Sequence, residues 1–193
     1  MTQSAQLSFP FTVYEVTRLG LDGIGKGLPA QRRDQLVAQC LTAADVLPLA
    51  PRRYDTLSGG EQRRVQFARA LVQLEAGRSV SERQALLLDE PVANLDLRHQ
   101  LALLDAARAA ASRGVAVLVV LHDLTLAARY ADTLAVMRDG VLVASGAPGA
   151  VLSGDLLSEA FGIALAVTAS LADDGLFVTP SRWIKEELHR SNS

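Results

Sequence analysis

Two short aliphatic runs, each ending in a polar residue, most strongly limit what this chain can fold into. Residues 85–88 are apolar and precede Asp89 and Glu90, and residues 115–121 are apolar and precede His122. An alanine-rich segment over residues 97–113, which reads as a helix, separates the two runs. Apolar strands that alternate with helices are typical of a parallel sheet covered by helices. The sequence therefore predicts an α/β fold, in which the strand over 115–121 is buried on both faces.

Length and composition exclude several classes of protein. The chain has 193 residues, which favours one domain, or one domain with a subdomain. Its 19 basic and 21 acidic residues give a net charge of −2, so we expect no nucleic-acid partner. The single cysteine, Cys40, excludes an internal disulfide and a cysteine metal cluster. Residues 115–121 form the longest aliphatic run and are too few to span a bilayer, and no signal peptide is visible, so we expect a soluble or peripheral protein.

Further elements follow from local patterns. Residues 29–46 place five apolar side chains at helical spacing, namely Leu36, Val37, Cys40, Leu41 and Ala44. Ser58 and Glu61 match a capping box that opens a second helix, which Gly77 can end. A short helix is predicted over residues 124–130, and Arg138-Asp139-Gly140 predicts a hairpin between strands at 134–137 and 141–144.

Residues 57–62 form the sharpest chemical signal. Gly59 and Gly60 allow backbone N–H groups to approach an anion closely, Ser58 adds a hydroxyl donor, and the helix that follows directs its positive dipole end at the same place. This combination predicts a docking surface for a phosphate. An ordinary capped helix explains the same four residues, so the motif alone leaves both interpretations open.

The acidic pair after the first aliphatic run is the second signal. Asp89 would lie at the carboxyl end of a buried strand, where α/β sheets bind ligands, and is placed to hold Mg²⁺. Glu90 is suited to orient an attacking water. The alternative to a functional site is an ordinary acidic turn after a strand. His122 at a strand end is more often structural than catalytic, and Asp96, taken alone, is the N-cap of the helix from Leu97.

Taken in this order, the segments resemble the ATP-binding-cassette (ABC) ATPases. Residues 57–62 resemble the family's signature motif, and residues 86–90 its Walker B motif with the catalytic glutamate. Asn94-Leu95-Asp96 resembles the D-loop, His122 the switch histidine and Gln3 the Q-loop glutamine. The resemblance implies a partial P-loop NTPase of the ABC type. A helical signature subdomain would occupy residues 8–76, and the second half of the ATPase core would occupy residues 80–193.

The resemblance also implies roles in a closed homodimer, where ATP lies between the Walker A motif of one subunit and the signature motif of the other. Ser58, Gly59 and Gly60 would contact the γ-phosphate of the nucleotide that the partner subunit holds. Asp96 would couple the two sites across the dimer. ATP and Mg²⁺ are the implied cofactors.

Within the chain's own site, the resemblance assigns the remaining residues. Asp89, with help from Gln3, would coordinate Mg²⁺. Glu90 would polarise the attacking water, and His122 would contact the γ-phosphate.

One motif of the family is missing. The phosphate-binding loop G-x-x-x-x-G-K-[ST] has only a near match at residues 20–27, which ends in Gly27 instead of a hydroxyl residue. A proline soon follows Lys26, and the near match lies after Gln3 instead of before it, so we expect Lys26 to be a solvated loop residue. The expectation is a chain that begins within a domain, as a fragment or through a mis-assigned start codon. Such a chain alone would be poorly soluble and would not hydrolyse ATP.

Two segments point to a transported substrate. Residues 7–20 and 122–132 resemble the ATP-binding subunits of haemin importers, which belong to the wider group that imports iron-siderophore complexes and cobalamin. The resemblance implies a peripheral protein at the cytoplasmic face of the bacterial inner membrane. Its partners would be a second copy, a transmembrane permease dimer and a periplasmic haem-binding protein. Two alternatives remain open. The imported substrate could be an iron-siderophore complex or cobalamin, or the chain could be a non-hydrolysing subunit that lends its signature motif to a competent partner.

An aromatic cluster near the start of the chain allows two interpretations. Phe9, Pro10, Phe11 and Tyr14 follow the Q-loop glutamine, in a region that in the family lies near the groove for the permease. Exposed aromatic side chains there would anchor a partner. The same side chains would equally well fill the core of the helical subdomain.

Overall fold

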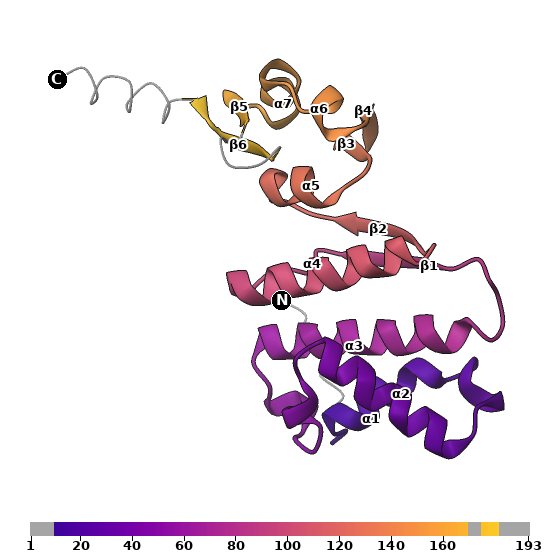
Figure 1. Ribbon diagram of the computed structural model, residues 1–193. Helices are drawn as coiled ribbons and strands as arrows, with labels where there is room; N and C mark the ends of the chain where they lie inside the picture. The colour runs from indigo at the N-terminus through magenta and orange to yellow at the C-terminus, as the bar shows by residue number, and fades with distance from the viewer. Residues whose placement is uncertain (1–9, 170–174, 182–193) are drawn as a thin grey trace. The chain divides into compact units, whose positions relative to one another are not determined.

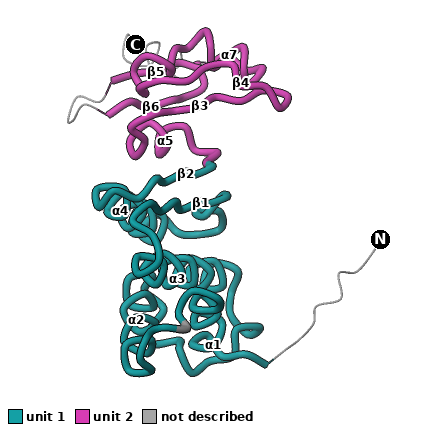
Figure 2. Tube along the Cα trace, turned by 90° about the vertical axis from the view of Figure 1, so that its right-hand side faces the viewer, with its two compact units in different colours: residues 1–120 teal, residues 121–193 magenta. Residues whose placement is uncertain are grey.

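The computed structural model describes residues 10–169 and 175–181, and the chain divides into two compact units between Val120 and Leu121 (Figure 2). The elements of the first unit are α1 (Val13–Arg18), α2 (Ala30–Ala43), α3 (Gly59–Gly77), β1 (Ala85–Asp89), α4 (Leu97–Ser112) and β2 (Ala116–Val120). Those of the second unit are α5 (Leu124–Tyr130), β3 (Leu134–Arg138), β4 (Val141–Gly146), α6 (Pro148–Val151), α7 (Gly154–Phe161), β5 (Leu165–Ala169) and β6 (Leu176–Pro180).

Helices α1, α2 and α3 pack on one another within the first unit (Figure 1). The predicted helix over 29–46 is confirmed as α2, and its five predicted apolar residues are all buried. It ends at Ala43, short of the predicted end, because Asp45 has a φ of +54°, which no helical residue adopts. The apolar side of α3 is buried, namely Val65, Phe67, Ala68, Leu71, Val72 and Leu74.

Side-chain caps set where three of these helices begin. Thr12 and Glu15 form a capping box at the start of α1, and Ser58 and Glu61 form the predicted one at the start of α3. Asp96 caps α4, also as predicted. A cap satisfies N–H groups that have no acceptor within their own helix, so each of these side chains fixes the first turn that follows it.

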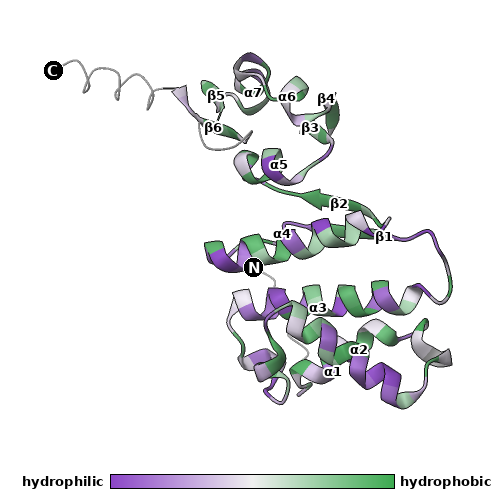
Figure 3. Cartoon of the chain, in the orientation of Figure 1, coloured by the Kyte–Doolittle hydropathy of each residue, from purple (hydrophilic) through white to green (hydrophobic). Residues whose placement is uncertain are grey.

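Strands β1 and β2 pair in parallel, which confirms the predicted α/β arrangement at this pair. Leu86 and Leu88 are buried, whereas Leu87 is 70% and Leu118 is 60% exposed. The prediction that the second strand is buried on both faces is therefore wrong for the described part of the chain. Within the described residues this sheet has two strands. Helix α4 packs against β2, and the face that carries Leu87 and Leu118 is open although β2 is hydrophobic along its length (Figure 3).

The register of this pair also places the acidic residue. Leu87 pairs with Leu118, and Asp89 pairs with Val120. Side chains on alternate residues of a strand share a face, so Asp89 lies on the same open face as the two leucines. The carboxylate of Asp89, at the end of the first aliphatic run, therefore lies on an exposed surface of the sheet.

The second unit confirms the predicted helix over 124–130 as α5 and the predicted hairpin as β3 and β4. Asp139 and Gly140 form its two-residue turn with φ of +50° and +78°, as a type I′ turn requires. A second antiparallel pair, β5 and β6, and the helices α6 and α7 were not predicted. Across residues 10–169 and 175–181, no helix is both long and apolar enough to cross a bilayer.

Candidate functional site

The amino end of α3 carries the predicted phosphate-docking residues on an exposed turn. The Ser58 backbone N–H and hydroxyl both donate to Glu61 Oε2 at 2.8 Å, and the Glu61 N–H donates back to Ser58 Oγ at 3.3 Å. These bonds hold the pKa of the Glu61 carboxyl below its usual value, the backbone N–H of Ser58 contributing most. Gly59 and Gly60, the first two helical residues, lie where N–H groups have no acceptor within the helix.

The structure brings the signature-like residues and the D-loop-like residues together. A hollow of about 460 Å³ is lined by Ser58, Gly59, Gly60, Glu61, Arg64, Asn94, Leu95, Asp96 and His99. Four of these, Ser58, Gly59, Gly60 and Asp96, are predicted site residues. A Cβ atom at Gly60 would lie 3.0 Å from the carbonyl oxygen of Asn94, so the two segments approach closely at this point.

Asp89 and Glu90 follow directly at the carboxyl end of β1. The Glu90 N–H donates to the Val120 carbonyl at 3.1 Å, and its carbonyl accepts from the Arg63 guanidinium of α3. Glu90 has a φ of +45°, a left-handed conformation that non-glycine residues rarely adopt. Its backbone is therefore held on both sides while its conformation is strained, as is common for residues at functional sites.

A second hollow, of about 530 Å³, lies beside Asp89 and is also lined by Gln62, Arg63 and Gln66. The described residues contain no group of three His, Cys, Asp or Glu side chains that could hold a metal ion. Protein Mg²⁺ sites of ATPases commonly use one or two carboxylates, with phosphate oxygens and waters as the other ligands. The exposed carboxylate of Asp89 fits that pattern. Gln3, the other predicted ligand, lies outside the described residues.

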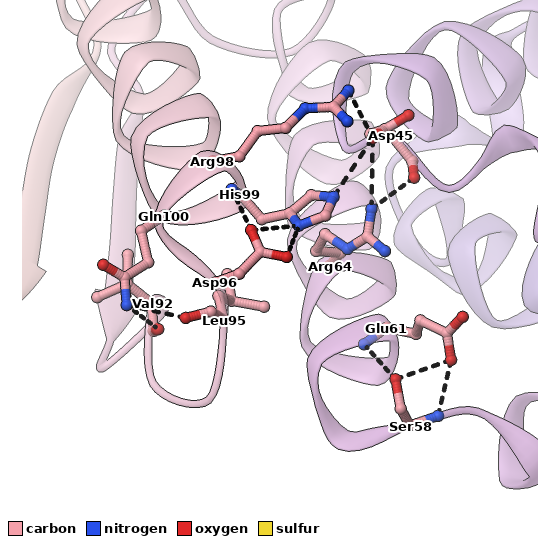
Figure 4. Close-up of polar contacts among 10 residues, drawn as sticks. All are labelled: Asp45, Ser58, Glu61, Arg64, Val92, Leu95, Asp96, Arg98, His99 and Gln100. Atoms are coloured by element: carbon pink, nitrogen blue, oxygen red, sulfur yellow. Dashed lines mark hydrogen bonds and ion pairs between the residues drawn. The ribbon is translucent and has the colours of Figure 1, made fainter.

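Asp96 is held by the helix that it caps. Its Oδ1 accepts the backbone N–H of His99 at 3.0 Å, and both carboxylate oxygens lie 2.8 Å from His99 Nδ1 (Figure 4). The backbone bond and then the ring contact lower the pKa of Asp96. Sequence reasoning missed His99, although its position three residues after a helix N-cap was a usable signal.

His122 belongs to the second unit. It lies on the surface just before Asp123, which caps α5 by accepting the Leu126 N–H at 2.9 Å. The predicted order of strand, histidine and helix is therefore confirmed, and the predicted phosphate contact stays a prediction.

The near match to a phosphate-binding loop does not open a helix. Residues Gly25–Gly27 form a short 3₁₀ turn, and α2 begins only at Ala30. In a phosphate-binding loop the helix starts around the lysine, whose neighbouring N–H groups cradle the phosphates. The side chain of Lys26 lies outside the described part of the structure.

Solved structures of ABC transporter proteins share the fold of this chain. An ABC transporter in an inward-facing conformation matches 93% of this chain and 69% of its own, with a TM-score of 0.71 at 21% identity. CbiO1 of Clostridium perfringens, part of the ABC transporter complex CbiONQ, matches 78% of this chain and 57% of its own, with a TM-score of 0.59 at 24% identity. The fold is that of an ABC nucleotide-binding domain, an α/β P-loop NTPase, as the sequence predicts.

Curated relatives narrow the assignment, whereas no protein-family model matches the chain. The hemin import ATP-binding protein HmuV of Rhizobium meliloti is 42% identical over 180 residues, which cover 93% of this chain and 68% of the relative. Proteins of the same name from Gloeobacter violaceus and Bordetella parapertussis are 47% and 46% identical, over 84% and 88% of this chain. The chain spans 59% and 64% of those two relatives. It belongs to the ABC transporter ATP-binding subunits, which confirms the predicted family.

Proposed function

We propose that this protein is the ATP-binding subunit of an ABC importer and couples MgATP hydrolysis to haemin uptake through a separate permease. The names of the relatives support the substrate. The observation that carries the ATP-dependent role is the shared hollow at the start of α3, where Ser58, Gly59 and Gly60 meet the loop that ends at Asp96. The helical signature subdomain over 8–76 and the ATPase-core half over 80–193 are part of this proposal.

The hollow suits the nucleotide of a second copy of the chain. N–H groups at the start of the 19-residue helix α3 and its positive dipole end favour a phosphate. Arg64 lines the same hollow, beside the carboxylates of Glu61 and Asp96. Ser58, Gly59 and Gly60 would receive the γ-phosphate of the nucleotide held by the partner subunit, and Asp96 would couple the two sites of the homodimer.

The carboxyl end of β1 supplies the groups for hydrolysis. Asp89, with Gln3, would hold Mg²⁺, which when bound neutralises phosphate charge. Glu90 would orient and polarise the attacking water, since a carboxylate can accept its proton or align its lone pair. The guanidinium of Arg63 fixes the carbonyl of Glu90, and so limits how far this residue can swing. His122 would contact the γ-phosphate.

A third hollow supports docking on a permease. Phe11, which is 43% exposed, lines a space of about 360 Å³ together with Glu15, Arg18 and Arg33. A large exposed aromatic side chain within a charged rim is typical of an interface anchor. This favours the interface over the core for Phe11, whereas Phe9 lies outside the described residues. The protein would sit at the cytoplasmic face of the inner membrane on a permease dimer, supplied by a periplasmic haem-binding protein.

The test is complementation. A strain that lacks its own haemin-import ATP-binding subunit but keeps the permease and the periplasmic protein would express the complete protein, with haemin as the only iron source. Growth and ATP-dependent haemin uptake are expected. Glu90→Gln should bind ATP and stall, while Glu82→Gln, on the exposed loop before β1, is the matched control. Unchanged uptake by Glu90→Gln would contradict the role of Glu90.

Two alternatives have separate outcomes. Growth on an iron-siderophore complex or cobalamin uptake, without haemin uptake, would identify the substrate as one of those. Uptake that needs this protein while hydrolysis depends only on a competent partner subunit would identify a non-hydrolysing subunit. The DNA upstream of the Met1 codon bears on the second case: an in-frame G-x-x-x-x-G-K-[ST] would favour hydrolysis, and a nearby stop codon would favour the non-hydrolysing subunit.

A further inference from the structure

Asp45 is a meeting point for three elements of the first unit. It follows α2 with a φ of +54°, and its backbone carbonyl accepts a hydrogen bond from Arg64 Nη1 of α3 at 2.6 Å. Its carboxylate Oδ2 lies 3.5 Å from Arg98 Nη2 and 3.4 Å from His99 Nε2, both on α4. Asp45 is thus fixed to the signature-like helix and at the same time faces the helix that Asp96 caps.

His99 closes this connection. One ring nitrogen, Nε2, faces Asp45, and the other, Nδ1, faces both carboxylate oxygens of Asp96 (Figure 4). The His99 side chain is 19% exposed, whereas that of Arg98 is 82% exposed. Carboxylate oxygens only accept hydrogen bonds, so the ring bridges the two carboxylates as an imidazolium that donates from both nitrogens. This rigid ring fixes the separation of the two carboxylates in a way that a long arginine side chain does not.

We propose that His99 is a positioning residue that, through Asp45, holds the Asn94–Asp96 loop against the amino end of α3. The path runs from Asp96 through His99 and Asp45 to Arg64, which lies in the second turn of the helix that begins at Gly59. Both ends of the path line the same hollow. The bridge therefore sets the width of the hollow. Its effect on turnover rests on the proposed function.

The bridge predicts a specific kinetic signature. In the proposed dimer of complete proteins, the phosphate-binding loop of the partner subunit would supply the main contacts to the nucleotide. A looser Asn94–Asp96 loop would therefore disturb the alignment of the γ-phosphate and leave those binding contacts in place. Loss of alignment lowers kcat with little change in KM. A purely structural defect would instead lower the amount of active protein and would be relieved at lower temperature.

The experiment compares four single variants of the complete protein, assembled with its permease: His99→Ala, His99→Gln, Asp45→Asn and Arg98→Gln. Arg98→Gln is the matched control, because Arg98 contacts the same Asp45 oxygen from the same helix. We expect His99→Ala and Asp45→Asn to lower kcat by about tenfold, with the KM for ATP within about twofold of wild type. The kcat of the double variant His99→Ala with Asp45→Asn should be no lower than that of either single variant, because each substitution removes the same bridge.

Hydrogen exchange gives a second measurement that needs no turnover. Amides of residues 93–99 should exchange faster in His99→Ala and Asp45→Asn and stay unchanged in Arg98→Gln. His99→Gln, whose amide can reach only one of the two carboxylates, should be intermediate and serves if His99→Ala fails to fold. Unchanged exchange, or an equal effect of Arg98→Gln, overturns the bridge. Absence of ATP turnover in the wild type would contradict the proposed function, and the exchange result would still decide the bridge.

Discussion

A methyl group on Gly60 would lie 3.0 Å from the carbonyl oxygen of Asn94 and 3.3 Å from the Leu95 side chain, whereas one on the adjacent Gly59 would meet nothing within 4 Å. Both glycines lie in the first turn of α3, so the difference in helix preference between alanine and glycine is similar at the two positions. Only at Gly60 must the neighbouring loop give way. We therefore expect Gly60→Ala to unfold at a lower temperature than Gly59→Ala, as followed by circular dichroism. Equal unfolding midpoints of the two variants would mean that the Asn94–Asp96 loop moves aside with no loss of stability.

The cap of α3 should be measurable as stability. Ser58→Ala removes the hydroxyl that accepts the Glu61 N–H and donates to its carboxylate, and we expect a loss of about 1 kcal/mol in the free energy of unfolding. Ser112→Ala is the matched control, since that hydroxyl donates only at the exposed end of α4. A loss as large in the control would show that the capping box contributes nothing special.

The same box predicts a pH dependence. Hydrogen bonds from Ser58 lower the pKa of Glu61 in the folded protein, so its contribution to stability is present above the unfolded value of about 4.3. That contribution is lost as the pH falls through the lower, folded pKa. Thermal unfolding of wild type and Glu61→Gln should differ at pH 7 and converge in acid, because glutamine keeps a neutral form of the box. A difference that stays constant with pH would contradict the prediction.

Cys40 should resist modification in the folded protein. Burial, with a smaller effect of the Glu75 charge, raises the pKa of its thiol to about 12. Since only the thiolate is nucleophilic, iodoacetamide at pH 8 should label it slowly in the native protein and rapidly in denaturant. Mass spectrometry follows both reactions. Rapid labelling without denaturant would mean that α2 opens often or that its buried side is misplaced.

Phe11 and Val13 should separate docking from folding. Phe11 is 43% exposed and Val13 is fully buried. Phe11→Ala is expected to change stability by less than about 0.5 kcal/mol while haemin uptake falls. Val13→Ala should cost about 2 kcal/mol. Normal uptake by a well-folded Phe11→Ala protein would remove Phe11 from the docking surface.

Sequence reasoning succeeded where the physics is local. The pairing of Ser58 with Glu61 and the capping by Asp96 depend on a three-residue spacing, which the sequence displays directly. The type I′ turn at Asp139 and Gly140 is equally local. Parallel pairing of the two aliphatic runs followed from their alternation with helices.

Reasoning failed where the outcome depends on distant neighbours. Whether the sheet face that carries Leu87 and Leu118 is exposed depends on which elements cover it, and a run of apolar residues does not indicate this. Asp45 reaches His99 only because the end of α2 lies beside α4, and nothing near either residue in the sequence signals the contact. The four-residue helix α6 is too short to carry a periodic pattern.

With the role proposed for Glu90, its left-handed backbone would set stability and activity against each other. A non-glycine residue in this conformation costs on the order of 1 kcal/mol, which glycine would recover. A library randomised at position 90 and selected for heat resistance should accumulate glycine, whereas selection for growth on haemin should return glutamate. The difference in residue frequencies at position 90 between the two populations would measure how much this carboxylate contributes to growth on haemin.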